Sequence, residues 1–177
     1  MLDVKSAIVE LLTKSEQCIG NSPNGVSCYF IPLSDMWAVK IYWHEETRDA
    51  GYDWQEKAAL HGLGPDVGEK FDLPEGTTVG EHRFCYITEI VETLGMDFFD
   101  PDGEMEWDVC DIDEHDEVRD LVDNLRTLIG FNFRDVHADN IGMKDGDLVC
   151  IDFAPPIFSF EADDRESVEN KLAKQWA

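Results

Sequence analysis

Apolar residues in the first third of the chain show first a helical and then an extended spacing. They recur every three to four positions over 4–14, which predicts a helix, and the turn-forming run 20–25 follows. Two segments rich in β-branched and aromatic residues, 26–32 and 37–43, predict strands. Ser34-Asp35 lies between them, so we expect a hairpin.

The middle of the chain predicts one more helix and two more strands. Good helix formers fill 45–61, and Gly62 ends that run. The segments 69–73 and 84–91 have extended apolar patterns, and the second is apolar enough for a central strand.

The last third predicts a helix, a loop and a hairpin. Apolar residues mark one face of a helix over 118–129, and Gly130 stands where such a helix ends. Apolar residues on both sides of the turn 144–147, which contains Asp-Gly, predict a short hairpin. The charged tail from Glu161 predicts a short final helix.

This order of elements is typical of an α+β fold with two lobes. We place the boundary where an acidic, loop-like segment begins. The prediction is an N-terminal β-rich lobe over 1–92 and a smaller C-terminal lobe over 93–177.

Composition narrows the classes of partner. The formal net charge is −25, which disfavours direct binding to nucleic acid or to an anionic membrane. No apolar run is long enough for a membrane span, and the N-terminus lacks the pattern of a secretion signal, so we expect a cytoplasmic protein. Five cysteines without a close-spaced pair argue against a disulfide framework and against zinc.

The negative charge is concentrated in one segment. Residues 97–117 contain eleven acidic side chains and no Lys or Arg. One interpretation is a solvated acidic loop, and the other is a surface that mimics nucleic-acid phosphates and binds a basic protein.

One run of residues has the pattern of a phosphoryl-transfer site. Asp135 and Asn140 lie five residues apart in the run 134–140, Arg-Asp-Val-His-Ala-Asp-Asn, and Asp152 follows an apolar stretch. Such chemistry uses one carboxylate to orient the attacking hydroxyl, and an amide oxygen with a second carboxylate to hold Mg²⁺. An acidic turn before a strand is the alternative interpretation.

These residues resemble the protein-kinase-like fold. The run 134–140 looks like the kinase catalytic loop, and Asp152-Phe153-Ala154 is similar to the Asp-Phe-Gly metal motif. His137 makes the loop closer to members that resemble aminoglycoside and lipopolysaccharide kinases. The resemblance implies that Asp135 is catalytic and that Asn140 and Asp152 bind Mg²⁺.

The same resemblance assigns roles in the N-terminal lobe. Lys40, in the segment 37–41, looks like the strand lysine that contacts the ATP phosphates, and Glu56 looks like the helix carboxylate that pairs with it. Thr88 would lie behind the adenine, and the backbone of Glu89 and Val91 would meet the edge of the ring.

The chain also departs from the kinase pattern. Gly20 and Gly25 are what remains of a glycine-rich phosphate loop, and Ala154 replaces the final glycine of the metal motif. Only 23 residues follow Ala154 in this sequence, so we expect a much reduced C-terminal lobe. The tail, a second copy of the chain or a partner protein would have to cover the helix at 118–129.

Two functions therefore stay open. The first is a minimal kinase-like phosphotransferase that uses ATP and Mg²⁺ and acts on a hydroxyl of an unknown acceptor. The second is a catalytically weak or inactive kinase-like scaffold that binds a basic partner protein through its acidic surface.

Overall fold

The structure is a computed structural model that describes residues 28–74, 82–94, 112, 115–133 and 136–153. The predicted helices at 4–14 and in the tail lie outside these residues. The described part has mixed helices and antiparallel strands, so the α+β prediction is confirmed at that level.

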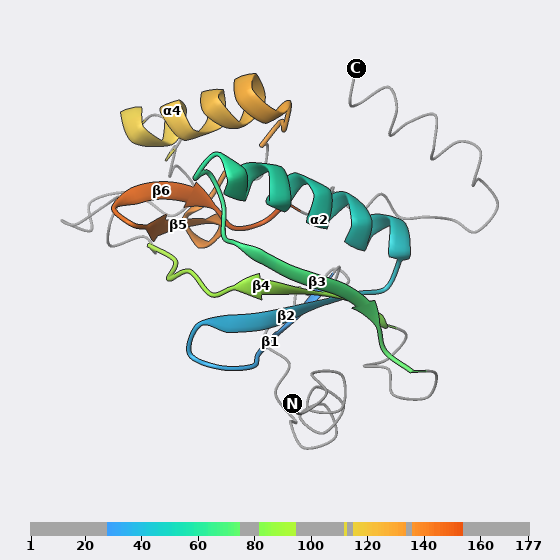
Figure 1. Cartoon of the computed structure of the whole chain (residues 1–177). Coiled ribbons are helices and arrows are strands. Elements are labelled where there is room, and N and C mark those ends of the chain that lie inside the picture. The colour runs from blue at the N-terminus through green and yellow to red at the C-terminus, as the bar shows by residue number, and fades with distance from the viewer. Residues whose placement is uncertain (1–27, 75–81, 95–111, 113–114, 134–135, 154–177) are drawn as a thin grey trace.

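A four-stranded antiparallel sheet is the larger of the two sheets in the described residues (Figure 1). Its strand order is β1-β2-β4-β3. The strands begin and end as follows: β1 Cys28–Pro32, β2 Trp37–Tyr42, β3 Val67–Asp72 and β4 Phe84–Glu89. Both central strands were predicted as strands, and their apolar sequences fit a position covered on both faces.

Helix α2, Glu45–Leu60, packs on one face of this sheet. Successive residues of β2 alternate between the two faces, as in any strand. Lys40 contacts α2 on one face, whereas Val39 and Ile41 belong to an apolar cluster with residues of β1, β3 and β4. Position 40 therefore faces α2 although its neighbours on both sides are apolar.

The remaining elements gather beside the C-terminal end of α2 (Figure 1). They are α4 Asp116–Asn124, continued by the π-helical turn η3 Leu125–Ile129, the 3₁₀ turn η4 Ala138–Asn140, and the hairpin strands β5 Ile141–Lys144 and β6 Asp147–Cys150. A second apolar cluster joins them to α2, with Ala58, Leu121, Leu125, Phe131 and Phe153 among its buried members.

Two turns confirm the sequence predictions at the backbone level. Gly130 ends the helix in the left-handed region at φ 78°, where glycine has no Cβ penalty. The β5–β6 turn has φ 55° at Asp145 and φ 96° at Gly146, and a two-residue hairpin with a type I′ turn needs positive φ at both of these positions.

No helix in the described ranges has the length and apolar character needed to cross a bilayer.

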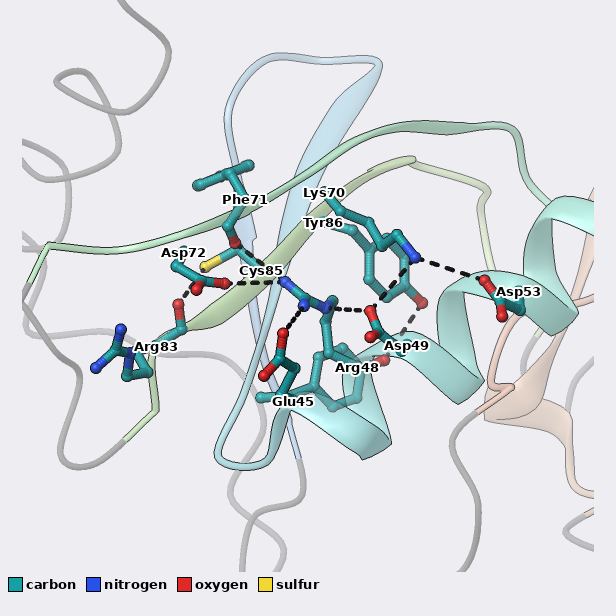
Figure 2. Close-up of polar contacts among 11 residues, drawn as sticks. Glu45, Arg48, Asp49, Asp53, Lys70, Phe71, Asp72, Arg83, Cys85 and Tyr86 are labelled. Carbon is teal, nitrogen blue, oxygen red and sulfur yellow. Dashed lines mark hydrogen bonds and ion pairs between the residues drawn. The ribbon is translucent and has the colours of Figure 1, made fainter.

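Arg48 connects α2 to the edge strand β3 (Figure 2). Its guanidinium is almost fully buried, and it bonds to Glu45 at 3.2 Å, Asp49 at 2.7 Å and Asp72 at 3.0 Å. Lys70 of β3 adds a contact of 3.3 Å to Asp49. The bond to Asp72 crosses from α2 to β3, and the bonds to Glu45 and Asp49, both in α2, hold the planar guanidinium in place for it.

We predict that Arg48→Met destabilises the protein by about 1–3 kcal/mol, because it removes buried charge-assisted hydrogen bonds. Denaturant unfolding measures the change. The matched control is Arg119→Met, whose 3.4 Å pair with Asp116 is exposed and should contribute less than about 0.5 kcal/mol. Equal effects of the two substitutions would contradict the anchoring role of Arg48.

Candidate functional site

Lys40 lies at the centre of a buried polar cluster between the sheet and α2. Only 5% of the residue is exposed, and its ammonium donates to the carbonyl of Ile151 at 2.9 Å and to Oε1 of Gln55 at 3.4 Å. Burial acts to lower the pKa of Lys40, but Tyr86 and the Asp152 carboxylate raise it, and the net pKa lies above the ordinary value. Lys40 therefore stays protonated at neutral pH.

The backbone of Ile151 joins three of the predicted site residues. Its carbonyl, in the peptide bond to Asp152, accepts from Lys40, and its N–H donates to the carbonyl of Asn140 at 2.9 Å. Lys40 comes from the first half of the chain, and the other two follow each other closely near the end. The structure thus brings Lys40, Asn140 and Asp152 to one place.

The buried ring of Phe153 anchors the backbone directly after Asp152. Its ring is fully buried, 5.1 Å from the ring of Phe131. A Cβ at Gly64 would stand 3.0 Å from the Phe153 ring, so the absence of a side chain there permits the packing. Asp152, one residue earlier, is only half-buried, and its carbonyl accepts from the Cys150 thiol at 3.3 Å.

Asn140 ends the 3₁₀ turn η4, which leads directly into β5. Its amide nitrogen lies 2.8 Å from Nε2 of His137, and it donates to that atom when the imidazole carries its proton on Nδ1. This arrangement directs the amide oxygen of Asn140 away from His137. Mg²⁺ binds oxygen atoms, so this amide oxygen is the atom through which Asn140 would bind the metal.

The donor chemistry of Asn140 and Asp152 fits Mg²⁺. Both offer hard oxygen ligands, and Mg²⁺ at nucleotide sites takes one or two carboxylates together with phosphate oxygens and water. In the described part of the chain no three His, Cys, Asp or Glu side chains gather as a ready-made metal site. A metal shared with a phosphate ligand needs no such cluster.

The prediction that Glu56 pairs with Lys40 is wrong. Glu56 is exposed, and its carboxylate accepts a hydrogen bond from the Tyr52 hydroxyl at 3.1 Å. The side chain of α2 that contacts Lys40 is Gln55, one residue earlier.

Helical geometry explains the error. The buried positions of α2 are Arg48, Gly51, Gln55 and Ala58, which follow the spacing of three and four residues expected for one helix face. Successive residues point about 100° apart around a helix, so Glu56 cannot share that face. The two small residues, Gly51 and Ala58, were the available signal, because they permit close packing of α2.

Gln55 is fully buried and uses all of its amide group. Its Oε1 accepts from Lys40 at 3.4 Å and from the Tyr86 hydroxyl at 2.9 Å. Its Nε2 donates to the carbonyl of Pro65 at 3.2 Å and to Oγ1 of Thr88 at 2.6 Å. Sequence reasoning did not single out this residue.

The residues predicted to meet the adenine lie at the end of β4 and just beyond it. Thr88 is buried against Gln55, and its hydroxyl donates to the Glu89 carbonyl at 3.2 Å. The Glu89 N–H already donates to the Asp66 carbonyl at 2.8 Å. Val91 lies so close to Gly142 of β5 that an added Cβ would stand 2.6 Å from its Cγ1. Contact of this segment with a nucleotide stays a prediction.

Other predicted site residues lie outside the described part of the chain. They are Asp135, Gly20 and Gly25, and with them most of the acidic segment 97–117. Their predicted roles stay predictions.

Lys144 of β5 ties the hairpin to the four-stranded sheet. Its ammonium lies 2.7 Å from the Glu89 carboxylate and 2.9 Å from that of Asp66. The Asp66 N–H also donates to Glu89 at 2.9 Å. Lys144 is partly buried, so water screens these pairs less than surface pairs. The cation holds the hairpin that follows Asn140 against the strand that carries Thr88.

Comparison of the chain with protein-family models, with curated proteins and with solved structures finds no significant match.

We predict that Lys144→Met lowers the free energy of unfolding by about 1–3 kcal/mol, because it leaves the carboxylates of Glu89 and Asp66 close together without a cation. Denaturant unfolding measures it. The control is Lys70→Met: the Lys70 side chain is 36% exposed, and its pair with Asp49 should contribute less than about 1 kcal/mol. If Lys144→Met cost no more than its control, the tie between hairpin and sheet would be rejected.

Proposed function

We propose that this chain is a minimal kinase-like phosphotransferase that uses ATP and Mg²⁺ and acts on a hydroxyl group. The proposal includes a two-lobed protein-kinase-like fold with a reduced C-terminal lobe, divided between residues 92 and 93, and a cytoplasmic location. The phosphoryl acceptor is left open.

The observation that carries the proposal is the meeting of Lys40, Asn140 and Asp152 at the backbone of Ile151. Phosphoryl transfer depends on positioning and on electrostatic stabilisation of the phosphates, so it needs a fixed cation beside metal-binding oxygens. A buried lysine with a raised pKa beside a half-buried carboxylate satisfies that need.

The order of the elements also supports a kinase-like arrangement. Among the described elements, the strand with Lys40 is followed by α2, β3 and β4, then by α4 with η3, the 3₁₀ turn η4 and the β5–β6 hairpin, and Asp152-Phe153 comes shortly after β6. Protein kinases likewise carry the lysine on a strand, then a helix that contacts it, a catalytic loop and an Asp-Phe metal motif.

Each residue has a proposed role in this reaction. Asp135 orients the acceptor hydroxyl or takes its proton, and Lys40 contacts the ATP phosphates. Asn140 and Asp152 would hold the Mg²⁺ ion, which neutralises charge on the phosphates. Thr88 lies behind the adenine.

We predict that ATP with millimolar Mg²⁺ raises the melting temperature of the native protein. A ligand at about 100 times its Kd stabilises by about 2.7 kcal/mol, or roughly 5–10 °C for a chain of this size. Asp152→Asn should abolish the shift, because it removes the carboxylate, and EDTA should do the same. The control Asp147→Asn changes an exposed carboxylate on β6 and should keep the shift.

The absence of a shift in the native protein at any Mg²⁺ concentration would contradict nucleotide binding. An equal shift in Asp152→Asn and Asp147→Asn would contradict the role of Asp152.

The burial of Lys40 favours the second candidate function, a catalytically weak or inactive kinase-like scaffold. With 5% of the residue exposed, the ammonium contacts protein atoms in this structure. In that function the acidic segment 97–117 binds a basic partner protein, and its apolar residues supply the anchors: Phe98, Phe99, Met105 and Trp107.

We predict for this scaffold that the immobilised protein retains specific partners from a lysate and loses them at high salt, because the attraction between exposed charges is screened. Replacing the acids of 97–117 by their amides should abolish this retention. Unchanged partners after the replacement would contradict the acidic segment as the binding surface.

A further inference from the structure

We propose that Gln55 is the positioning residue that fixes Lys40 for an anionic ligand, and that it must act as a neutral amide. The inference rests on the proposed phosphotransferase function and deepens it. It replaces the ion pair predicted from the sequence with a contact of a different chemical kind.

The partners of Gln55 determine which way its amide points. The Pro65 carbonyl, 3.2 Å from Nε2, can only accept a hydrogen bond, so it must face the NH₂ group. Lys40, on the opposite side, can only donate, so it must face the oxygen. Tyr86 donates to the same oxygen at 2.9 Å. The orientation of the amide follows from these contacts.

A carboxylate could not replace this amide. Glutamate at position 55 would keep the acceptor that faces Lys40 and Tyr86, but it has no N–H to give to the Pro65 carbonyl. Two acceptor oxygens would then face each other in a buried place, which costs stability. The Thr88 hydroxyl could donate to the carboxylate only by giving up its bond to the Glu89 carbonyl, and it would leave the Pro65 carbonyl without a donor.

The neutral partner also determines the charge of the site. Lys40 bonds to an amide oxygen and a backbone carbonyl, and neither carries a formal charge. Among the described side chains the carboxylate that acts on it is that of Asp152, which the proposed function assigns to Mg²⁺. If Asp152 served as a Mg²⁺ ligand, its carboxylate would be engaged there, and the positive charge of Lys40 would be available for a phosphate oxygen.

Gln55 further connects this cation to the predicted adenine site. Its NH₂ group bonds to Thr88 of β4 and its oxygen to Lys40 of β2, two neighbouring strands. One buried side chain therefore fixes both the phosphate-binding cation and the residue behind the base.

The test measures how fast a small amine-reactive acylating reagent labels Lys40, with the modified peptide quantified by mass spectrometry. Three full-length variants are compared with the native protein. Gln55→Met removes all four hydrogen bonds, Gln55→Glu keeps the acceptors and loses the donors, and Glu56→Gln is the matched control on the neighbouring position.

Gln55→Met should raise the labelling rate of Lys40 by about tenfold or more, because the ammonium loses a hydrogen-bond partner. Glu56→Gln should stay within about twofold of the native rate. Gln55→Glu should keep Lys40 protected while its melting temperature falls. A residue that served only the fold would make labelling follow stability, so Gln55→Glu distinguishes positioning from mere packing.

The proposal is overturned if Gln55→Met and Glu56→Gln label alike, or if Gln55→Glu is as stable as the native protein. Circular dichroism checks that each variant is folded. Should Gln55→Met not fold, Gln55→Glu carries the test, and deprotection of Lys40 in that variant overturns the proposal.

A second measurement separates this inference from the proposed function. ATP with Mg²⁺ should slow the labelling of Lys40 in the native protein and less so in Gln55→Met. No protection of the native protein by ATP and Mg²⁺ would overturn the proposed function. The labelling differences between variants without nucleotide would then still report whether Gln55 fixes Lys40.

Discussion

The structure depends on how the buried ammonium of Lys40 is accommodated. A charge almost removed from water is tolerated only with hydrogen-bond partners in good geometry. The sheet supplies the lysine, α2 supplies the Gln55 oxygen, and the segment after β6 supplies the Ile151 carbonyl. Because the three partners come from three parts of the chain, satisfying one charge fixes their mutual positions. The carbonyl of Asn140 accepts from the N–H of the same residue, Ile151, so Asn140 is positioned by its backbone as well.

Two other charged contacts hold the frame in which this cluster lies. Arg48 fixes α2 to β3, and Lys144 fixes the β5–β6 hairpin to the ends of β3 and β4. Arg48 is almost fully buried and Lys144 is partly buried, and each is shared by more than one carboxylate, which makes it more effective than an exposed pair. The whole chain has 39 acidic and 14 basic side chains, and in its described part Lys40, Arg48 and Lys144 supply these connections.

Patterns local in sequence were predicted well. Three features depend on short-range backbone preferences, and the structure has them where expected: the apolar strands, Gly130 at the end of α4 and η3, and the Asp-Gly hairpin. The choice of Glu56 over Gln55 failed because it followed charge rather than the helix face marked by Gly51 and Ala58. The Lys144 contacts could not be predicted, since they join residues distant in sequence through the sheet register. Asp135 lies outside the described residues, so its catalytic role stays a prediction.

The hydrogen bond from the Lys40 ammonium to the Ile151 carbonyl links the sheet to the segment that carries Asp152. Side-chain NMR tests it directly in protein labelled with ¹⁵N and ¹³C, with Lys40→Arg used to assign the ammonium signal. We expect a slowly exchanging Lys40 ammonium with a scalar coupling across the hydrogen bond to the Ile151 carbonyl carbon. A rapidly exchanging ammonium without that coupling, like those of exposed lysines, would contradict it.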